Sequence, residues 1–213
     1  MNAPNWIGIR IQINDEPLDL NTCKSITNFR RELNMKEGWY KRNFNAVLSN
    51  DIEIEVSTTR FLSLDYDELG AISYEIKLIN TDAELTFSPY LDSGIKNRDS
   101  NWDDKFWNTS NVVSQGNRAF IEAQTMKTNF STCTFMQTQM SINGTALKEQ
   151  FETNSSDLSV ALNCVISGKK GDIIQLTKYG GYTTSRYHKV DELIQTANTV
   201  LDTASSLGFN TLL

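Results

Sequence analysis

Residues 39–56 read WYKRNFNAVLSNDIEIEV, and this run contains the pattern that recurs along most of the chain. Residues 39–48 are rich in aromatic and apolar side chains, and the turn-forming sequence SND follows them at 49–51. In residues 52–56, isoleucine and valine alternate with glutamate, so one face of the segment is apolar and the other is charged. Two strands joined by a short turn, one of them with a wet face, predict part of an antiparallel sheet.

The same period of two appears on both sides of this run. Residues 6–13, WIGIRIQI, place Ile7, Ile9, Ile11 and Ile13 on one face of a predicted strand. Residues 35–38 form a hairpin loop in which glycine supplies the positive φ angle. Further strands are predicted at residues 29–34, 71–80, 84–90, 112–113, 119–128, 130–142, 158–166, 173–179 and 182–185. About a dozen short strands at regular spacing predict an all-β chain folded as a large antiparallel β-sandwich.

Composition excludes several classes of protein. The chain has 213 residues and a formal net charge of −6, which argues against a nucleic-acid partner because such proteins present a basic face. One histidine and three cysteines without a CxxC pair argue against a metal site, and no cofactor is expected. No stretch approaches the roughly 18 apolar residues of a membrane span, and no signal peptide is visible at the N-terminus. A cytoplasmic protein is therefore expected.

The C-terminal segment changes period. From Lys189 to Leu207 the apolar residues recur at helical spacing, with Asp191 and Glu192 in the first turn, where the helix dipole favours anions. Gly208 follows as a C′ glycine. The predicted stripe consists of Val190, Leu193, Ile194, Ala197, Val200, Leu201, Ala204 and Leu207. Such a helix must either fold back onto the sandwich or leave an apolar patch that favours self-association.

A long polar stretch with aromatic residues lies between two predicted strands. Residues 93–110 read SGIKNRDSNWDDKFWNTS, which is long for a sandwich loop. Aromatic rings can stack on the C–H face of a sugar while amides, carboxylates and arginine bind its hydroxyls, although the same rings could instead tie the loop to the sandwich. The candidate sugar-cleft or domain-interface residues are Asn97, Arg98, Asp99, Asn101, Trp102, Asp103, Phe106 and Trp107.

Several stretches taken in order resemble family 65 of the glycoside hydrolases, which includes maltose, kojibiose and trehalose phosphorylases. The loop at 97–107 is similar to that of the maltose phosphorylase type. The other stretches that carry the resemblance are PNW at 4–6, FRRELNMKEG at 29–38, RFLSL at 60–64 with GAISY at 70–74, YTTSR at 182–186 and LGFNTLL at 207–213.

The resemblance implies the non-catalytic N-terminal domain of a disaccharide (α-glucoside) phosphorylase or hydrolase, which shapes the sugar cleft and supports domain or subunit contacts. That domain is a galactose-mutarotase-like supersandwich, here residues 1–187, followed by a linker helix, here residues 188–213, toward an (α/α)6 catalytic barrel. The barrel, the disaccharide, inorganic phosphate and a homodimer are the implied partners. The family's opening segment and its barrel have no counterpart in this sequence, so the chain is expected to be a piece truncated at both ends and to carry no catalytic residue.

Two other functions compete with this one. A free-standing carbohydrate-binding module would use the loop around Trp102 and Trp107 as its platform. An aldose-epimerase-type enzyme of the same architecture would need two histidines beside a carboxylate, and His188 is the only histidine. Arg30, Arg31 and Arg60 are expected to be structural, with the doublet pointing to opposite faces of one strand.

Overall fold

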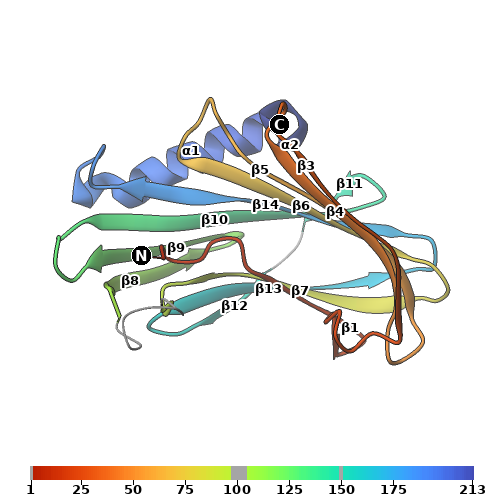
Figure 1. The fold of residues 1–213 in the computed structure, drawn as a ribbon. Coiled ribbons are helices and arrows are strands. Elements are labelled where there is room, and N and C mark those ends of the chain that lie inside the picture. Colours follow the sequence, from red (N-terminus) through yellow and green to blue (C-terminus); the bar gives the residue numbers. More distant parts are fainter. Residues whose placement is uncertain (1, 97–104, 149–150) are drawn as a thin grey trace.

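The computed structural model describes residues 2–96, 105–148 and 151–213, and within them two antiparallel sheets pack face to face (Figure 1). The smaller sheet has the order β12-β13-β7-β1-β2. Its strands are β1 Ile9–Ile13, β2 Glu16–Pro17, β7 Ala83–Asp92, β12 Glu152–Ser155 and β13 Ser159–Gly168. The predicted antiparallel sandwich is confirmed.

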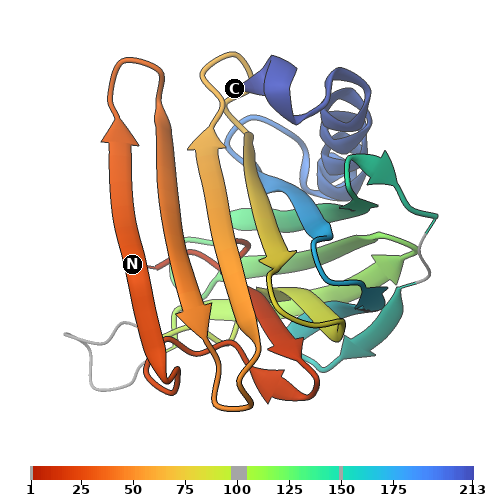
Figure 2. The same ribbon diagram turned by 90° about the vertical axis from the view of Figure 1, so that its right-hand side faces the viewer.

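The larger sheet has the order β3-β4-β5-β6-β14-β10-β9-β8, with β11 paired to β10. Its strands are β3 Ser25–Asn34, β4 Trp39–Val47, β5 Glu53–Leu62, β6 Leu69–Leu78, β8 Trp107–Gln115, β9 Arg118–Thr125, β10 Ser131–Ile142, β11 Thr145–Ala146 and β14 Ile173–Thr184. The edge strands β3 and β4 extend beyond the smaller sheet (Figure 2), and β3 is exposed along nearly its whole length.

The alternating run quoted above packs as its pattern predicts. Ile54 and Val56 are 1% and 0% exposed and belong to the core between the sheets, whereas Glu53 and Glu55 face solvent. On β14, the even-numbered Ile174 and Leu176 join this core, and the odd-numbered Tyr179 joins a second apolar cluster on the opposite face of the sheet. The larger sheet is therefore covered on both faces.

The C-terminal helix covers that opposite face. A 3-10 turn at Val190–Glu192 leads into α1, Leu193–Leu207, and the short α2, Phe209–Leu212, follows. Figure 1 shows α1 lying along β14 and β10, on the far side from the smaller sheet. Its stripe of Leu193, Ala197, Leu201 and Ala204 is buried against Phe120, Phe135 and Tyr179. Of the two predicted outcomes, the structure shows the helix folded back.

Polar groups reinforce this packing. Arg118 of β9 donates from Nε to Gln137 at 2.8 Å, from Nη1 to Asn198 at 2.8 Å and from Nη2 to Asp202 at 2.5 Å. Thr183 donates to the carbonyl of Leu193 at 2.9 Å. A guanidinium fork that spans sheet and helix fixes the rotation of α1 as well as its position.

The prediction for Val190 is wrong, because the first turn is a 3-10 turn and leaves this side chain 53% exposed. The prediction for Gly208 is confirmed. Its φ is 77°, and its N–H donates to the carbonyl of Ala204, as expected of a residue that ends a helix.

The N-terminal strand also departs from its prediction. β1 begins at Ile9, and Ile7 is 47% exposed instead of sharing a buried face with the other isoleucines. The reason lies in the residues on either side of Ile7, which cross between the sheets. The indole of Trp6, 6% exposed, lies on Gly70 of β6 and Gly180 of β14, which are partners in the ladder. A Cβ atom at Gly70 would lie 2.7 Å from the ring.

Those glycines also explain why one long strand replaces two predicted ones. The sequence suggested separate strands at 173–179 and 182–185, but β14 runs through Gly180 and Gly181 without a break. At Gly181 an added Cβ would overlap the carbonyl oxygen of Glu68. The glycine pair therefore provides room for neighbouring groups within a straight strand, and it does not mark a turn.

The deepest polar contact is made by Lys178, which is 0% exposed and lies between the sheets. Its Nζ donates to the carbonyls of Gly8 and Tyr90, each at 2.9 Å. Burial holds the pKa of Lys178 well below its ordinary value of 10.5. Two N–H groups of the buried Nζ are thus accepted by backbone carbonyls.

This burial makes stability depend on pH. Because the unfolded chain binds the Lys178 proton more readily than the folded chain does, stability should rise with pH up to the ordinary lysine pKa, by at most about 1.4 kcal/mol per pH unit. We expect Lys178→Met to remove that rise, since the variant has no proton to lose. Urea unfolding at pH 7, 8, 9 and 10 measures it, and Lys77→Met, an exposed lysine on β6, is the control. Equal slopes for the wild type and Lys178→Met would contradict the assignment.

The indole on the glycine pair gives a second test. Gly70→Ala should lower the free energy of unfolding by about 1–3 kcal/mol, because the new methyl group overlaps the Trp6 ring. In a Trp6→Leu background the smaller side chain leaves room for the methyl group. The cost of Gly70→Ala should then fall by at least half, a non-additivity that a double-mutant cycle in urea detects. Strict additivity would show that the two residues do not share this contact.

Candidate functional site

Six of the eight candidate residues predicted from the sequence lie outside the described part of the chain: Asn97, Arg98, Asp99, Asn101, Trp102 and Asp103. The other two can be placed. Phe106 is half-buried, and its carbonyl accepts from the N–H of Met126 at 3.0 Å. Trp107 opens β8, and the structure puts its ring inside the domain.

Trp107 has a structural role in this domain. Its side chain is 7% exposed, its Nε1 donates to the carbonyl of Asn2 at 2.8 Å, and its ring meets that of Phe130 at a centroid distance of 6.5 Å. These contacts connect the N-terminal segment to the end of the 93–110 stretch. They hold one end of the predicted loop rigidly against the sandwich.

The most exposed apolar side chains gather at the tips of two neighbouring hairpins. Leu33 and Met35, at the β3–β4 tip, are 64% and 87% exposed, and Leu62 and Leu64, at the end of β5 and just after it, are 70% and 96% exposed. Figure 2 shows both tips at the end of the molecule where α2 lies. We call these four residues the hairpin-tip patch. Large apolar side chains exposed side by side are typical of a surface that another protein surface covers.

The sequence builds the β3–β4 tip as a rigid loop. Asn34 Oδ1 accepts from the N–H groups of Lys36 and Glu37, each at 3.0 Å. The Glu37 carboxylate accepts from Trp39 Nε1 at 2.7 Å and from Asn34 Nδ2 at 2.9 Å. Gly38 completes the loop with a φ of 77°. Hydrogen bonds within the loop fix its conformation, so Met35 does not need to pack against other apolar side chains to hold the loop in place.

The second tip is joined to the C-terminal segment. The ring of Phe61 meets that of Phe209 edge to face at 5.2 Å, and Glu68 Oε1 lies 2.7 Å from His188 Nε2. Both partners of the latter pair are half-buried. The helical segment, the β5–β6 loop and the hairpin-tip patch therefore form one connected end of the domain. The partner of His188 is 120 residues away in the sequence, so no local pattern indicates this pair.

The three arginines expected to be structural each have a partner. Arg30 pairs with Glu32 at 2.7 Å, Arg31 lies over the ring of Phe29 at 5.4 Å, and Arg60 lies over the ring of Tyr40 at 4.7 Å. Arg30 and Arg31 occupy successive positions of β3 and so project to opposite faces.

Two acidic pairs on and after β5 lie in solvent, which gives neither the setting of a buried general acid. Glu53 and Glu55 are exposed on β5, and Asp65 and Asp67 are exposed in the β5–β6 loop. In the part of the chain that the structure covers, no group of three or more histidine, cysteine or carboxylate side chains could hold a metal ion. No helix among the described residues is long and apolar enough to cross a membrane.

Comparisons with known proteins agree with this architecture. Residues 1–213 match the sequence model of glycosyl hydrolase family 65, N-terminal domain. The maltose phosphorylase of Bacillus subtilis strain 168 is 32% identical over 211 residues, which are 98% of this chain and 27% of that protein. The alpha,alpha-trehalose phosphorylase of Thermoanaerobacter brockii is 25% identical over 214 residues, covering 96% of this chain and 27% of that protein.

A solved structure also has a similar fold. A putative kojibiose phosphorylase from the human microbiome superposes with a TM-score of 0.85 at 27% identity, over 99% of this chain and 26% of that one. The chain thus spans about a quarter of the length of the relatives it matches. Sheet order, the C-terminal helix and the match over residues 1–213 lead to one conclusion: the chain belongs to the N-terminal domain family of glycosyl hydrolase family 65.

Proposed function

We propose that this chain is the non-catalytic N-terminal domain of an α-glucoside phosphorylase, and that it packs against a catalytic (α/α)6 domain and shapes one wall of the sugar cleft. The observation that carries the proposal is the hairpin-tip patch on a domain of this family. Leu33, Met35, Leu62 and Leu64 contribute nothing to the core of the sandwich, so their exposure is explained by a partner surface.

The two ends of the 93–110 stretch have different roles. Trp107 holds the end of the stretch to the sandwich. For the polar candidate residues before it, which lie outside the described part of the chain, we propose a role in the sugar cleft. A carbohydrate-binding module would need an exposed aromatic platform. Of the described tryptophans, Trp6 and Trp107 are buried, and Trp39 is half-buried with its Nε1 bound to Glu37. The described residues therefore favour a wall of a larger site over a free-standing module.

Hydrolysis or phosphorolysis of a glycosidic bond requires a general acid beside the glycosidic oxygen. We expect the purified chain, incubated with maltose, kojibiose or trehalose and phosphate, to release no glucose 1-phosphate above background. A coupled assay for glucose 1-phosphate measures this, with an intact maltose phosphorylase as the positive control. Product formation that depends on the chain would contradict the non-catalytic assignment.

The hairpin-tip patch can be tested in a chimera in which this chain replaces the N-terminal quarter of the B. subtilis maltose phosphorylase. Leu62→Ser with Leu64→Ser should lower kcat/KM and the Tm of the chimera, because the apolar surface between the domains is lost. In the isolated chain the same pair should change the free energy of unfolding by less than about 0.5 kcal/mol, since both residues are exposed.

Val165→Ser is the matched control for that chimera. Val165 is an apolar residue on β13 of the smaller sheet with 54% exposure, and it lies outside the patch. It should leave both the chimera and the isolated chain unchanged. If the Leu62 and Leu64 changes affected the chimera no more than Val165→Ser does, the patch would not be a domain interface.

A further inference from the structure

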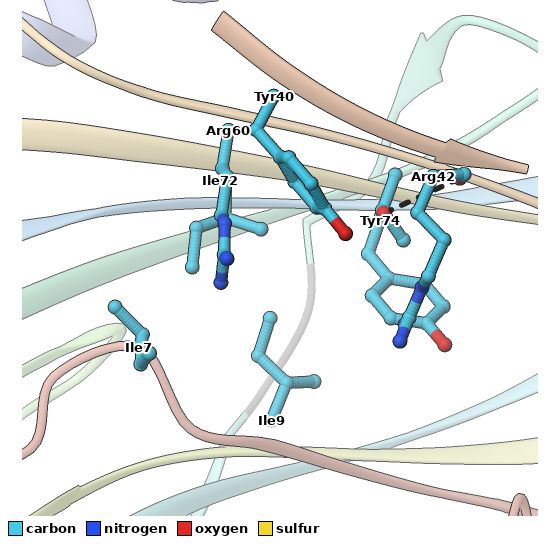
Figure 3. Close-up of a pocket in the computed structure, with 8 residues that line it drawn as sticks. Ile7, Ile9, Tyr40, Arg42, Arg60, Ile72 and Tyr74 are labelled. Carbon is cyan, nitrogen blue, oxygen red and sulfur yellow. Dashed lines mark hydrogen bonds between the residues drawn. The ribbon is translucent and has the colours of Figure 1, made fainter. Parts of the chain in front are cut away.

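A cleft of about 210 Å³ lies between the larger sheet and the N-terminal segment (Figure 3). It adjoins a second pocket that Leu33 and Leu62 of the hairpin-tip patch line together with Tyr40 and Arg60. One wall consists of Ile7 and Ile9. The other consists of side chains from β4, β5 and β6: Tyr40, Arg42, Thr58, Arg60, Ile72 and Tyr74. The sticks in Figure 3 show the guanidinium groups of Arg42 and Arg60 both directed into the space in front of the two isoleucines.

The ladder brings these side chains together in two rows. Tyr40 pairs with Arg60, which pairs with Ile72 on the next strand. Arg42 pairs with Thr58, which pairs with Tyr74. Because paired residues project from the same face of a sheet, two arginines, two phenol groups and a hydroxyl share one surface. No stretch of sequence contains this set, since it spans three strands.

The charge of this surface is uncompensated. Arg31 pairs directly with Arg42 across β3 and β4, so three guanidinium groups lie on neighbouring strands, although the chain as a whole carries a net charge of −6. Each of the three stacks on an aromatic ring: Arg31 on Phe29, Arg42 on Phe44 and Arg60 on Tyr40. Within residues 2–96, 105–148 and 151–213, none of the three forms a salt bridge with a carboxylate. Like charges placed opposite each other on a sheet destabilise it unless an anion lies between them.

Arg42 also has an unused donor. Its Nε is buried and has no hydrogen-bond acceptor among the described residues. Thr58 uses its hydroxyl on the carbonyl of Arg42 at 3.4 Å, a weak bond that leaves it free to turn toward the cleft. A buried donor without a partner is costly, and an oxyanion bound beside the Arg42 guanidinium would offer the acceptor that Nε lacks.

We propose that this cleft binds a phosphate-type oxyanion, either inorganic phosphate or the phosphate group of a small monoester, between Arg42 and Arg60. The planar fork of arginine matches the paired oxygens of a phosphate. The hydroxyl groups of Tyr40 and Tyr74 supply further donors, and Ile7, Ile9 and Ile72 provide an apolar wall for the organic part of an ester. The site lies within this domain, so it does not depend on the proposed catalytic partner.

The 213-residue chain is titrated with sodium phosphate, glucose 1-phosphate and glucose at constant ionic strength, and binding is followed by amide chemical shifts. Constant ionic strength prevents simple screening from imitating binding. We expect saturable shifts on β4, β5 and β6 with phosphate or glucose 1-phosphate, and none with glucose. Equal affinity for both anions identifies free phosphate as sufficient, and tighter binding of the ester identifies a monoester site. Absence of saturation with both anions would overturn the proposal.

Arg60→Gln is the main variant, because Arg60 is exposed and its loss should not prevent folding. It should weaken binding by about 10- to 100-fold, the usual effect of losing a charge-assisted hydrogen bond. Arg42→Gln should do the same, with near-ultraviolet circular dichroism as the check on its fold. Arg10→Gln is the matched control, since Arg10 is an exposed arginine that stacks on Tyr90 at 4.4 Å outside the cleft. If Arg10→Gln weakened binding as much as Arg60→Gln does, the effect would be one of net charge and the site would be refuted.

Discussion

The crossing of the N-terminal segment between the two sheets depends on one buried amine. Lys178 has no exposure, and it bonds two carbonyls that belong to different segments, Gly8 and Tyr90. An amine removed from water must find acceptors, and those acceptors must come to it. The contact therefore fixes the distance between β14 of the larger sheet and β7 of the smaller one, and it holds the segment before β1 between them.

Neighbouring features depend on that crossing. Once Gly8 is fixed, the Trp6 ring falls on the paired glycines of β6 and β14, and Gly8 itself lies under the ring of Tyr90, where a Cβ atom would have no room. Ile7 is turned outward and becomes one wall of the arginine cleft. The cleft is thus a consequence of how the chain enters the sandwich. Its charged wall, in turn, comes from the part of the larger sheet next to the edge that the smaller sheet does not cover.

The opposite face of the larger sheet has a different role. There α1 is held both by its apolar stripe and by two hydrogen bonds from Arg118, to Asn198 and Asp202, so the helix is an integral part of the sandwich domain. Because α1 is fixed on the sheet, the short helix α2 that follows it is fixed as well. The end of β5 touches α2 through Phe61 and Phe209, and this contact fixes the position of the hairpin-tip patch relative to α1 and α2. Rigid presentation of an apolar surface suits a domain that packs against a larger partner.

Period and turn chemistry alone predicted the β-sandwich, the alternation at residues 52–56, the Gly38 hairpin and the helix that ends at Gly208, because these features depend on residues close together in the chain. The sequence stretches that resemble family 65 of the glycoside hydrolases, which occur along the chain in the same order as in that family, predicted the family. Tertiary structure alone decided the place of Ile7, the continuity of β14 through Gly180 and Gly181, the burial of Trp107 and the partner of His188. It also decided that Arg42 and Arg60 line the same cleft. Each of these features depends on which strands become neighbours in the sheets and on the path of the N-terminal segment between them. Contacts between residues that are far apart in the sequence produce no local sequence pattern from which they could be predicted.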